Sequence, residues 1–375
     1  MGKLFERSAI NGLELSNRFV RSATWEGMAT EDGAVTPRLI ETMTALAKGG
    51  VGLIISSHAY VRPEGQAGPW QLGVYKDELV EGLREMTEAV HSSGGKIVMQ
   101  LSHAGTYAYE RGIGQPPLVV SDFEGLATSP RKEMTAQDIR EIVNAFGDAA
   151  RRAKSAGFDG VQLHSAHGYL LSQFLSPFFN RRRDEYGGDI RRRSRVHLEA
   201  YQAIRNAVGE DYPVLIKMNC RDFVENGLSL EDSVQVAGFL GNAGMDAIEL
   251  SGGVFSAGKL SPSRAGIDSE EKEAYFREEA RVFKKEIEVP LILVGGIRSF
   301  NVAERLVEDG IADYISMCRP LIREPDLINR WKAGDRRKAD CTSDNLCFKP
   351  GGQGEGIYCV PKRRAEKTVS RVKCS

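Results

Sequence analysis

Two histidines and a tyrosine follow one another closely after a predicted strand. Residues 160–163 (GVQL) are predicted to form a short buried strand, and His164, His167 and Tyr169 come after it. Imidazole groups can polarise a carbonyl, and a phenol can deliver a proton. Enzymes built on parallel barrels carry their catalytic residues at the carboxyl ends of their strands. The sequence therefore predicts a site that polarises a carbonyl group and handles protons.

A metal site is the alternative interpretation of two histidines at this spacing. Zinc sites in proteins use three or four ligands. No further His or Cys stands at the end of an obvious strand near His164 and His167. Tyr169 alone would be read as a packed aromatic side chain. We therefore predict a catalytic group and no metal ligand.

The sequence of residues 164–188, HSAHGYLLSQFLSPFFNRRRDEYGG, resembles the signature of the Old Yellow Enzyme family of FMN-dependent oxidoreductases. Other segments match this family in the same order along the chain, from about residue 4 to 335. The chain therefore resembles a short form of the family, related to the barrel domain of 2,4-dienoyl-CoA reductase. The matching segments are Leu4-Phe5, 13–20 (LELSNRFV), 100–105 (QLSHAG), 293–297 (LVGGI) and 318–321 (CRPL).

The resemblance implies FMN as cofactor and NADH or NADPH as a freely diffusing electron donor. The substrate would be an activated alkene, the C=C bond of an α,β-unsaturated carbonyl compound. His164 and His167 would bind the carbonyl oxygen, and Tyr169 would protonate the α-carbon. One alternative is a flavin-dependent dehydrogenase or oxidase of an amine or hydroxy acid, which should use a base. A second alternative is a flavin-binding electron-relay protein.

Residues at the ends of other predicted strands would bind the flavin. Gly295-Gly296 follows the seventh strand and Cys318-Arg319 the eighth, where barrels commonly bind phosphate. Lys217 ends the fifth strand, and its positive charge would stabilise reduced flavin. Trp25 stands where many relatives have Thr or Cys beside the flavin carbonyl. This difference bears on the redox potential of the flavin and on the shape of the site. By the resemblance, the remaining flavin contacts are Ser22, Ala23, Thr24, His58 and Gln100.

Strand-like and helix-like segments alternate along the chain. Eight predicted strands, each followed by a helix, predict a single-domain (β/α)8 TIM barrel over residues 1–335. A doubly wound sheet is the alternative, but no strand is followed by the Gly-x-Gly-x-x-Gly nucleotide turn. Residues 102–132, rich in Gly, Pro and Ser, are predicted to form a long loop after the third strand, as in active-site lids.

The composition excludes several classes of protein. The chain has 375 residues, 41% of them hydrophobic, and a formal net charge of -1. This balance gives no reason to expect nucleic acid as a partner. No apolar run approaches the ~20 residues needed to span a membrane. The amino terminus lacks a secretory signal, so a cytoplasmic location with reduced cysteines is expected. The sequence leaves a homo-oligomer open.

Residues 336–375 form a predicted cysteine-containing extension. Cys341, Cys347 and Cys359 resemble the iron–sulfur segment of larger relatives such as 2,4-dienoyl-CoA reductase, which use four cysteines. Asp344 stands at one expected cysteine, and the spacing to Cys347 is one residue short. Because such clusters require thiolate ligands, we predict a degenerate remnant without an intact cluster. Zinc or a labile cluster are the alternatives.

Overall fold

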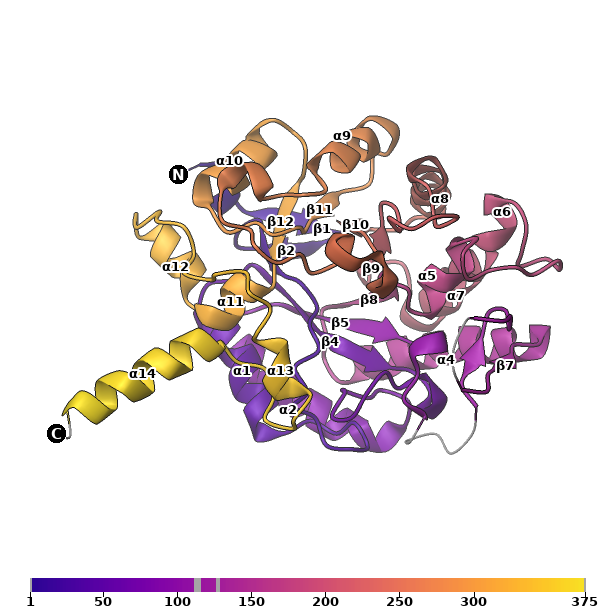
Figure 1. Cartoon of the computed structure of the whole chain (residues 1–375), viewed down its shortest axis with the longest axis horizontal. Helices are drawn as coiled ribbons and strands as arrows, with labels where there is room; N and C mark the ends of the chain where they lie inside the picture. The colour runs from indigo at the N-terminus through magenta and orange to yellow at the C-terminus, as the bar shows by residue number, and fades with distance from the viewer. Residues whose placement is uncertain (1, 111–115, 126–128, 374–375) are drawn as a thin grey trace.

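The structure is a computed structural model that describes residues 2–110, 116–125 and 129–373. Eight strands pair in parallel and close into a barrel in the spatial order β10, β11, β12, β3, β4, β5, β8 and β9. Figure 1 shows helices around these strands, which confirms the predicted (β/α)8 barrel. The barrel strands are β3 (Phe19–Arg21), β4 (Leu53–Tyr60), β5 (Ile97–Ser102), β8 (Gly160–Ser165), β9 (Val214–Asn219), β10 (Ala247–Ser251), β11 (Leu291–Leu293) and β12 (Tyr314–Met317).

Helices follow the barrel strands along the chain, and most of them bury one face. Helix α4 (Ala136–Ser155) begins after Thr135, and the side chains of Thr135 and Asp138 cap each other's backbone N–H groups. The helix then buries residues such as Ile139 and Phe146. The other helices are α1 (Pro37–Lys48), α2 (Val80–Ser92), α5 (Leu170–Leu175), α6 (Ile190–Arg193), α7 (Arg195–Val208), α8 (Leu230–Asn242), α9 (Arg277–Glu286), α10 (Phe300–Glu308), α11 (Arg319–Arg323), α12 (Leu327–Lys332), α13 (Phe348–Gly351) and α14 (Val360–Lys373).

The amino-terminal end of the barrel is closed by apolar side chains. A hairpin of β1 (Ser8–Ile10) and β2 (Leu13–Leu15) contributes Ile10 and Leu15 to this cluster. They pack with inward-facing residues of the barrel strands, which are Val20, Leu53, Ile55, Val98, Leu215, Ala247, Ile292 and Tyr314. Polar chemistry is therefore confined to the opposite end, where the strands finish.

Two strands are longer than predicted, and this moves two site residues. The apolar run 51–55 predicts a second strand that ends before two serines. In the structure β4 continues to Tyr60, because its pairing with β5 resumes beyond a bulge. His58 pairs there with Gln100. His58 was expected after the second strand and Gln100 at the end of the third, and both lie within strands. The first barrel strand, β3, is by contrast shorter than predicted: it ends at Arg21, and residues 22–25 follow it as a loop.

The loop after β5 and the C-terminal segment both reach the carboxyl end of the barrel. The loop contains a 3-10 turn, η4 (Gly105–Tyr107), and a two-stranded sheet of β6 (Leu118–Val119) and β7 (Lys132–Glu133). The C-terminal segment is hydrogen-bonded to the barrel by the backbone of Ala339 and of Ile357, whose N–H donates to Glu26 O. Helix α14, at the yellow end of the chain, then extends away from the body (Figure 1). In the described part of the chain, no helix has the length and apolar character required to cross a membrane.

Candidate active site

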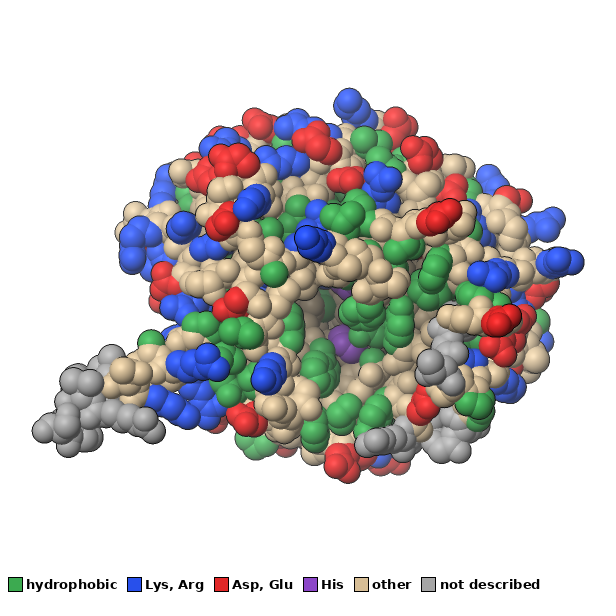
Figure 2. Space-filling view, viewed as in Figure 1, with side chains coloured by type: hydrophobic (Ala, Val, Ile, Leu, Met, Phe, Trp, Pro, Cys, Tyr) green, Lys and Arg blue, Asp and Glu red, His purple; other side chains and the backbone are tan. Residues whose placement is uncertain are grey.

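One pocket at the carboxyl ends of the barrel strands gathers the predicted site. In Figure 2 the surface is hollowed at this point, with histidine visible inside and hydrophobic side chains around the opening. Gly295 is absent from the lining but precedes Gly296, which lines it. The predicted residues that line the pocket are Ser22, Ala23, Thr24, Trp25, His58, Gln100, His164, His167, Tyr169, Lys217, Gly296, Cys318 and Arg319.

His164, His167 and Tyr169 lie together on one wall of this pocket. The ring centroids of His164 and Tyr169 are 4.7 Å apart, and those of His164 and His167 are 5.4 Å apart. His167 has a left-handed backbone with φ of 65°, which turns the chain directly after β8. Its Nε2 lies 2.8 Å from the hydroxyl of Ser251. The structure thus places the three side chains named from the sequence close together, and their catalytic role stays a prediction.

These three groups are held in their uncharged forms. Burial lowers the pKa of His164 and His167 well below the usual range, and the positive charge of Lys217 acts in the same direction. Burial raises the pKa of Tyr169, so its phenol keeps its proton. The Nδ1 atom of His164 is buried and has no hydrogen-bond partner among the residues that the structure describes. The wall therefore presents neutral donors, one of them with a ring nitrogen still free to bind a ligand.

His58 and the loop after β5 complete this wall. The ring of His58 lies 5.4 Å from that of Tyr169, and the Gln71 amide lies 2.6 Å from His58 Nδ1. Burial, with the charge of Lys217, lowers the pKa of His58 to about 4. Tyr107 of the predicted lid loop packs edge-on against Tyr169, with centroids 6.4 Å apart. The wall is therefore aromatic and uncharged at neutral pH.

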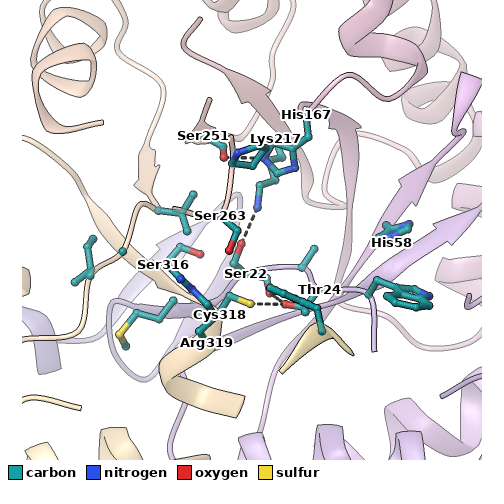
Figure 3. A pocket seen from close by; sticks show the side chains of 18 of the residues that line it. Ser22, Thr24, His58, His167, Lys217, Ser251, Ser263, Ser316, Cys318 and Arg319 are labelled. Carbon is teal, nitrogen blue, oxygen red and sulfur yellow. Dashed lines mark hydrogen bonds between the residues drawn. The ribbon is translucent and has the colours of Figure 1, made fainter. Parts of the chain in front are cut away.

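Next to this wall, Lys217 of β9 pairs in register with His164 and contacts a buried carboxylate that sequence reasoning missed. Glu249 lies at the centre of β10, and its side chain is fully buried. Lys217 lies 3.2 Å from Glu249 Oε1 and donates to Ser22 Oγ at 2.7 Å, and Ser22 donates to Oε1 at 2.7 Å. In Figure 3 the Lys217 ammonium points towards Ser22. A Glu within the apolar run 247–251 was the signal that could have revealed this network.

Further donors complete the shell around this carboxylate. Ser316 donates to Oε1 at 2.8 Å, and Gln162 donates to Oε2 at 3.0 Å. Gln162 in turn accepts a hydrogen bond of 2.7 Å from Gln100. Burial alone would raise the pKa of Glu249, but the Lys217 charge and these hydrogen bonds hold that pKa below its usual range. Lys217 is thus a cation already paired inside the protein.

The ends of β11 and β12 form a cradle with positive charge. Gly296 has φ of 73°, and a Cβ added there would lie only 2.7 Å from the ring of Tyr275. The backbone can therefore approach a ligand at this point only with glycine. Arg319 is 7% exposed, and in the described residues it forms no ion pair with a carboxylate. Thr24 Oγ1 lies 3.0 Å from Cys318 Sγ, and Figure 3 marks this contact with a dashed line.

The donor set fits an FMN. A phosphate needs backbone N–H groups and a cation, and the cradle offers Gly296 and Arg319. The pyrimidine edge of a flavin needs polar partners, and Lys217 and Gln100 line the same pocket. The indole Nε1 of Trp25 is buried and has no partner in the described part of the chain, as expected for a donor that meets a ligand.

The C-terminal segment also lines the pocket, which the sequence did not indicate. Ser343 and Phe348 belong to the lining, and the ring of Trp25 packs against Gly351. Other lining residues that sequence reasoning missed come mainly from the loops after β10 and β11. They are Ser251, Phe255, Pro262, Ser263, Tyr275, Val294, Ile297, Arg298, Ser316, Met317 and Pro320.

The cysteines of the extension are not arranged as a metal site. Cys341, Cys347 and Cys359 are present as free thiols. Over residues 2–110, 116–125 and 129–373, no group of three His, Cys, Asp or Glu side chains is placed to hold a metal ion. The absence of an iron–sulfur cluster remains a prediction that needs chemical analysis.

Comparison with known proteins agrees with the geometry. Residues 3–338 match the model of the NADH:flavin oxidoreductase / NADH oxidase family. The NADH oxidase of Thermoanaerobacter brockii is 41% identical over 352 residues, which cover 92% of this chain and 53% of that protein. A structure of 2-naphthoyl-CoA reductase with 2-naphthoyl-CoA superposes with a TM-score of 0.88 at 28% identity, covering 95% of this chain and 56% of the other.

An Old Yellow Enzyme homologue of Zymomonas mobilis matches over nearly its whole length. Its TM-score is 0.76 at 25% identity, and the match covers 93% of this chain and 98% of that one. By contrast, the chain spans about half the length of the NADH oxidase and of the 2-naphthoyl-CoA reductase. Together these matches confirm the predicted resemblance.

Proposed function

The chain belongs to the NADH:flavin oxidoreductase / NADH oxidase family, and from this premise we propose that it is an FMN-dependent ene-reductase. It would take hydride from NADH or NADPH and reduce the activated C=C bond of an α,β-unsaturated carbonyl compound. When bound, FMN supplies the hydride chemistry. The residues of this chain bind the cofactor, orient the substrate and move the proton.

The observation that carries the proposal is the uncharged wall of His164, His167 and Tyr169. A neutral imidazole keeps one N–H, and two such donors beside the substrate oxygen would stabilise negative charge that develops there. The unpartnered Nδ1 of His164 supports this role because buried polar atoms normally have partners. Tyr169 keeps its proton at neutral pH and would give it to the α-carbon.

The residues that would hold the cofactor, apart from Gly295, line the same pocket as this wall. Arg319 and the backbone at Gly295 and Gly296 would hold the phosphate. Lys217 and Gln100 would meet the pyrimidine edge of the flavin. The loop after β3, from Ser22 to Trp25, and His58 would complete the contacts.

A dehydrogenase of amines or hydroxy acids would need a group that accepts a proton from the substrate. The raised pKa of Tyr169 disfavours that role at neutral pH. An electron-relay protein would require no substrate clamp. The uncharged wall therefore supports alkene reduction over both alternatives.

The first experiment identifies the flavin and then separates the two half-reactions. The purified protein should release FMN, and no FAD, on denaturation. Under anaerobic conditions NADH or NADPH should bleach the bound flavin, and an enone such as 2-cyclohexenone should restore its colour with formation of the saturated ketone. A bleached protein that no enone reoxidises would favour the relay, and bleaching by an amine or hydroxy acid would favour the dehydrogenase.

Three expectations about organisation belong to this proposal. The family match ends at residue 338, near the predicted boundary between residues 1–335 and 336–375, which supports a barrel followed by an extension. A cytoplasmic location and a nicotinamide nucleotide as diffusing partner remain predictions. Homo-oligomer formation also awaits measurement.

A further inference from the structure

We propose that Asn345, in the C-terminal segment, is a positioning residue for the cofactor phosphate and acts through Arg319. This inference rests on the proposed function, because it takes FMN as the ligand of the cradle after β11 and β12. It gives the C-terminal extension a role in cofactor binding that involves no metal.

Arg319 is held by neutral acceptors. Its Nη1 donates to the carbonyl of Arg264 at 2.8 Å and to Asn345 Oδ1 at 2.7 Å. The guanidinium is nearly buried, yet in the described part of the chain no carboxylate neutralises it. Because both bonds use Nη1, N–H groups on the other two nitrogens remain for an anion. The site therefore fixes this arginine and preserves its charge.

Asn345 is itself anchored by a loop of the barrel. Its Nδ2 donates to the carbonyl of Ser263 at 2.7 Å, and Oδ1 accepts from the Ser263 hydroxyl at 3.0 Å. A guanidinium can only donate, so Oδ1 must face Arg319, and this fixes the orientation of the amide. The backbone of Asn345 has φ of 60°, a left-handed conformation that asparagine tolerates better than most residues.

The chain around Asn345 is fastened to the same end of the barrel. Gly266 N–H donates to the carbonyl of Ser343 at 3.1 Å, and Ala339 N–H donates to the carbonyl of Arg298 at 2.8 Å. Ser343 and Arg298 both line the pocket. The segment therefore brings Asn345 to Arg319 with a defined geometry, and the long arginine side chain is ordered before a ligand arrives.

Comparison of FMN with riboflavin tests this role, because riboflavin lacks only the phosphate. Dissociation constants of both flavins would be measured by flavin fluorescence on full-length protein stripped of cofactor, for wild type, Asn345→Ala, Arg319→Ala and the double variant. Asn345→Ala should weaken FMN binding about tenfold, as loss of a charge-assisted hydrogen bond would. Riboflavin binding should change by less than about twofold, because the substituted contact serves only the phosphate. In the Arg319→Ala background, Asn345→Ala should have little further effect.

Two further variants complete the experiment: one is a control, and the other is a second test of Asn345. Asp344→Ala removes an exposed neighbour that, among the described residues, bonds only Thr342 and the backbone of Leu346, and it should leave both affinities unchanged. Asn345→Asp keeps the shape and the contact with Arg319 but adds a carboxylate that neutralises the guanidinium. It should also weaken FMN binding selectively, and it provides a test if the alanine variant does not fold.

Each outcome points to a different conclusion. If wild type prefers FMN and both Asn345 variants keep that preference, or lose affinity for both flavins equally, the positioning role is wrong. If wild type binds riboflavin as tightly as FMN, the phosphate cradle of the proposed function is wrong, and this inference fails with it. A selective loss of FMN binding that disappears without Arg319 supports the proposal.

Discussion

Two neighbouring groups of residues at the pocket differ in how far their polar atoms are already satisfied. Around Glu249, Lys217, Ser22, Ser316 and Gln162 all bond to one another or to the carboxylate. On the wall of His164, a buried ring nitrogen has no hydrogen-bond partner within residues 2–110, 116–125 and 129–373. The hydrogen bonds of the Glu249 network are therefore complete within the protein. The wall of His164, His167 and Tyr169, the open wall, keeps a polar atom that requires a ligand. The difference separates the residues that hold the site in shape from those that meet the substrate.

Two of the three residues of the open wall lie outside the strand ladder that carries the Glu249 network. The residues of the satisfied network lie on neighbouring strands or immediately after them, where ladder pairing fixes their separation. His167 and Tyr169 lie in the turn between β8 and α5, where the backbone has left the ladder, whereas His164 lies within β8 and pairs with Lys217 of β9. If this account holds, substitutions on the open wall should change chemistry, and substitutions in the network should change the properties of the flavin.

The largest effect should come from Tyr169→Phe on the open wall. The variant lacks the proton donor, so alkene reduction should slow by about 10²–10⁴. Reduction of the flavin by NADH or NADPH should be unchanged, because it needs no phenol. Anaerobic stopped-flow measurement of each half-reaction checks both statements. Unchanged flavin reoxidation by the alkene, shown to limit turnover, would assign the proton to water or to another side chain.

A smaller effect is expected for the stability of the protein in acid. The pKa of His58 is lowered to about 4 in the folded state, so between its ordinary value of about 6.5 and 4 only the unfolded state takes up the proton. The contribution of uncharged His58 to the free energy of unfolding is therefore present above pH 6.5 and is lost as the pH falls towards 4. At pH 5 this group should cost about 2 kcal/mol of the free energy of unfolding.

The matched variant for this effect is His58→Gln, which offers Gln71 an acceptor but does not titrate. Urea unfolding at pH 7 and pH 5 would compare the two proteins. The variant should lose less stability on acidification than wild type. Equal losses would mean that His58 is not held neutral in the folded protein.

The satisfied network should tune the flavin. Glu249→Gln leaves the Lys217 charge without its carboxylate partner, so the reduced flavin anion should be stabilised and the midpoint potential raised. We expect a rise of about 30 mV, equivalent to ~1.4 kcal/mol for two electrons. Spectroelectrochemistry of the FMN-bound protein measures it. Ser316→Ala is the control, because it removes one hydroxyl donor but keeps the ion pair; an equal shift in both variants would contradict the electrostatic account.

The barrel and the residues of the open wall could be predicted because both depend on residues that lie close together in the sequence. Alternating apolar segments indicated the strands, and His164, His167 and Tyr169 stand close together in the chain. The network was missed because Gln162 and Glu249 are far apart in sequence and only closure of the barrel brings them together. Asn345 was missed for the same reason, since its contact with Arg319 depends on how the C-terminal segment folds back.

The most direct test of the open wall is a titration of the oxidised, FMN-bound protein with para-hydroxybenzaldehyde. If neutral imidazoles on this wall stabilise an oxygen anion, the phenol should bind as phenolate and produce a long-wavelength charge-transfer band with the flavin. His164→Ala should remove the band while the flavin stays bound, and Tyr169→Phe should retain it. A band of undiminished intensity in His164→Ala, or no band in wild type at saturating phenol, would contradict the assignment of His164 to the substrate oxygen.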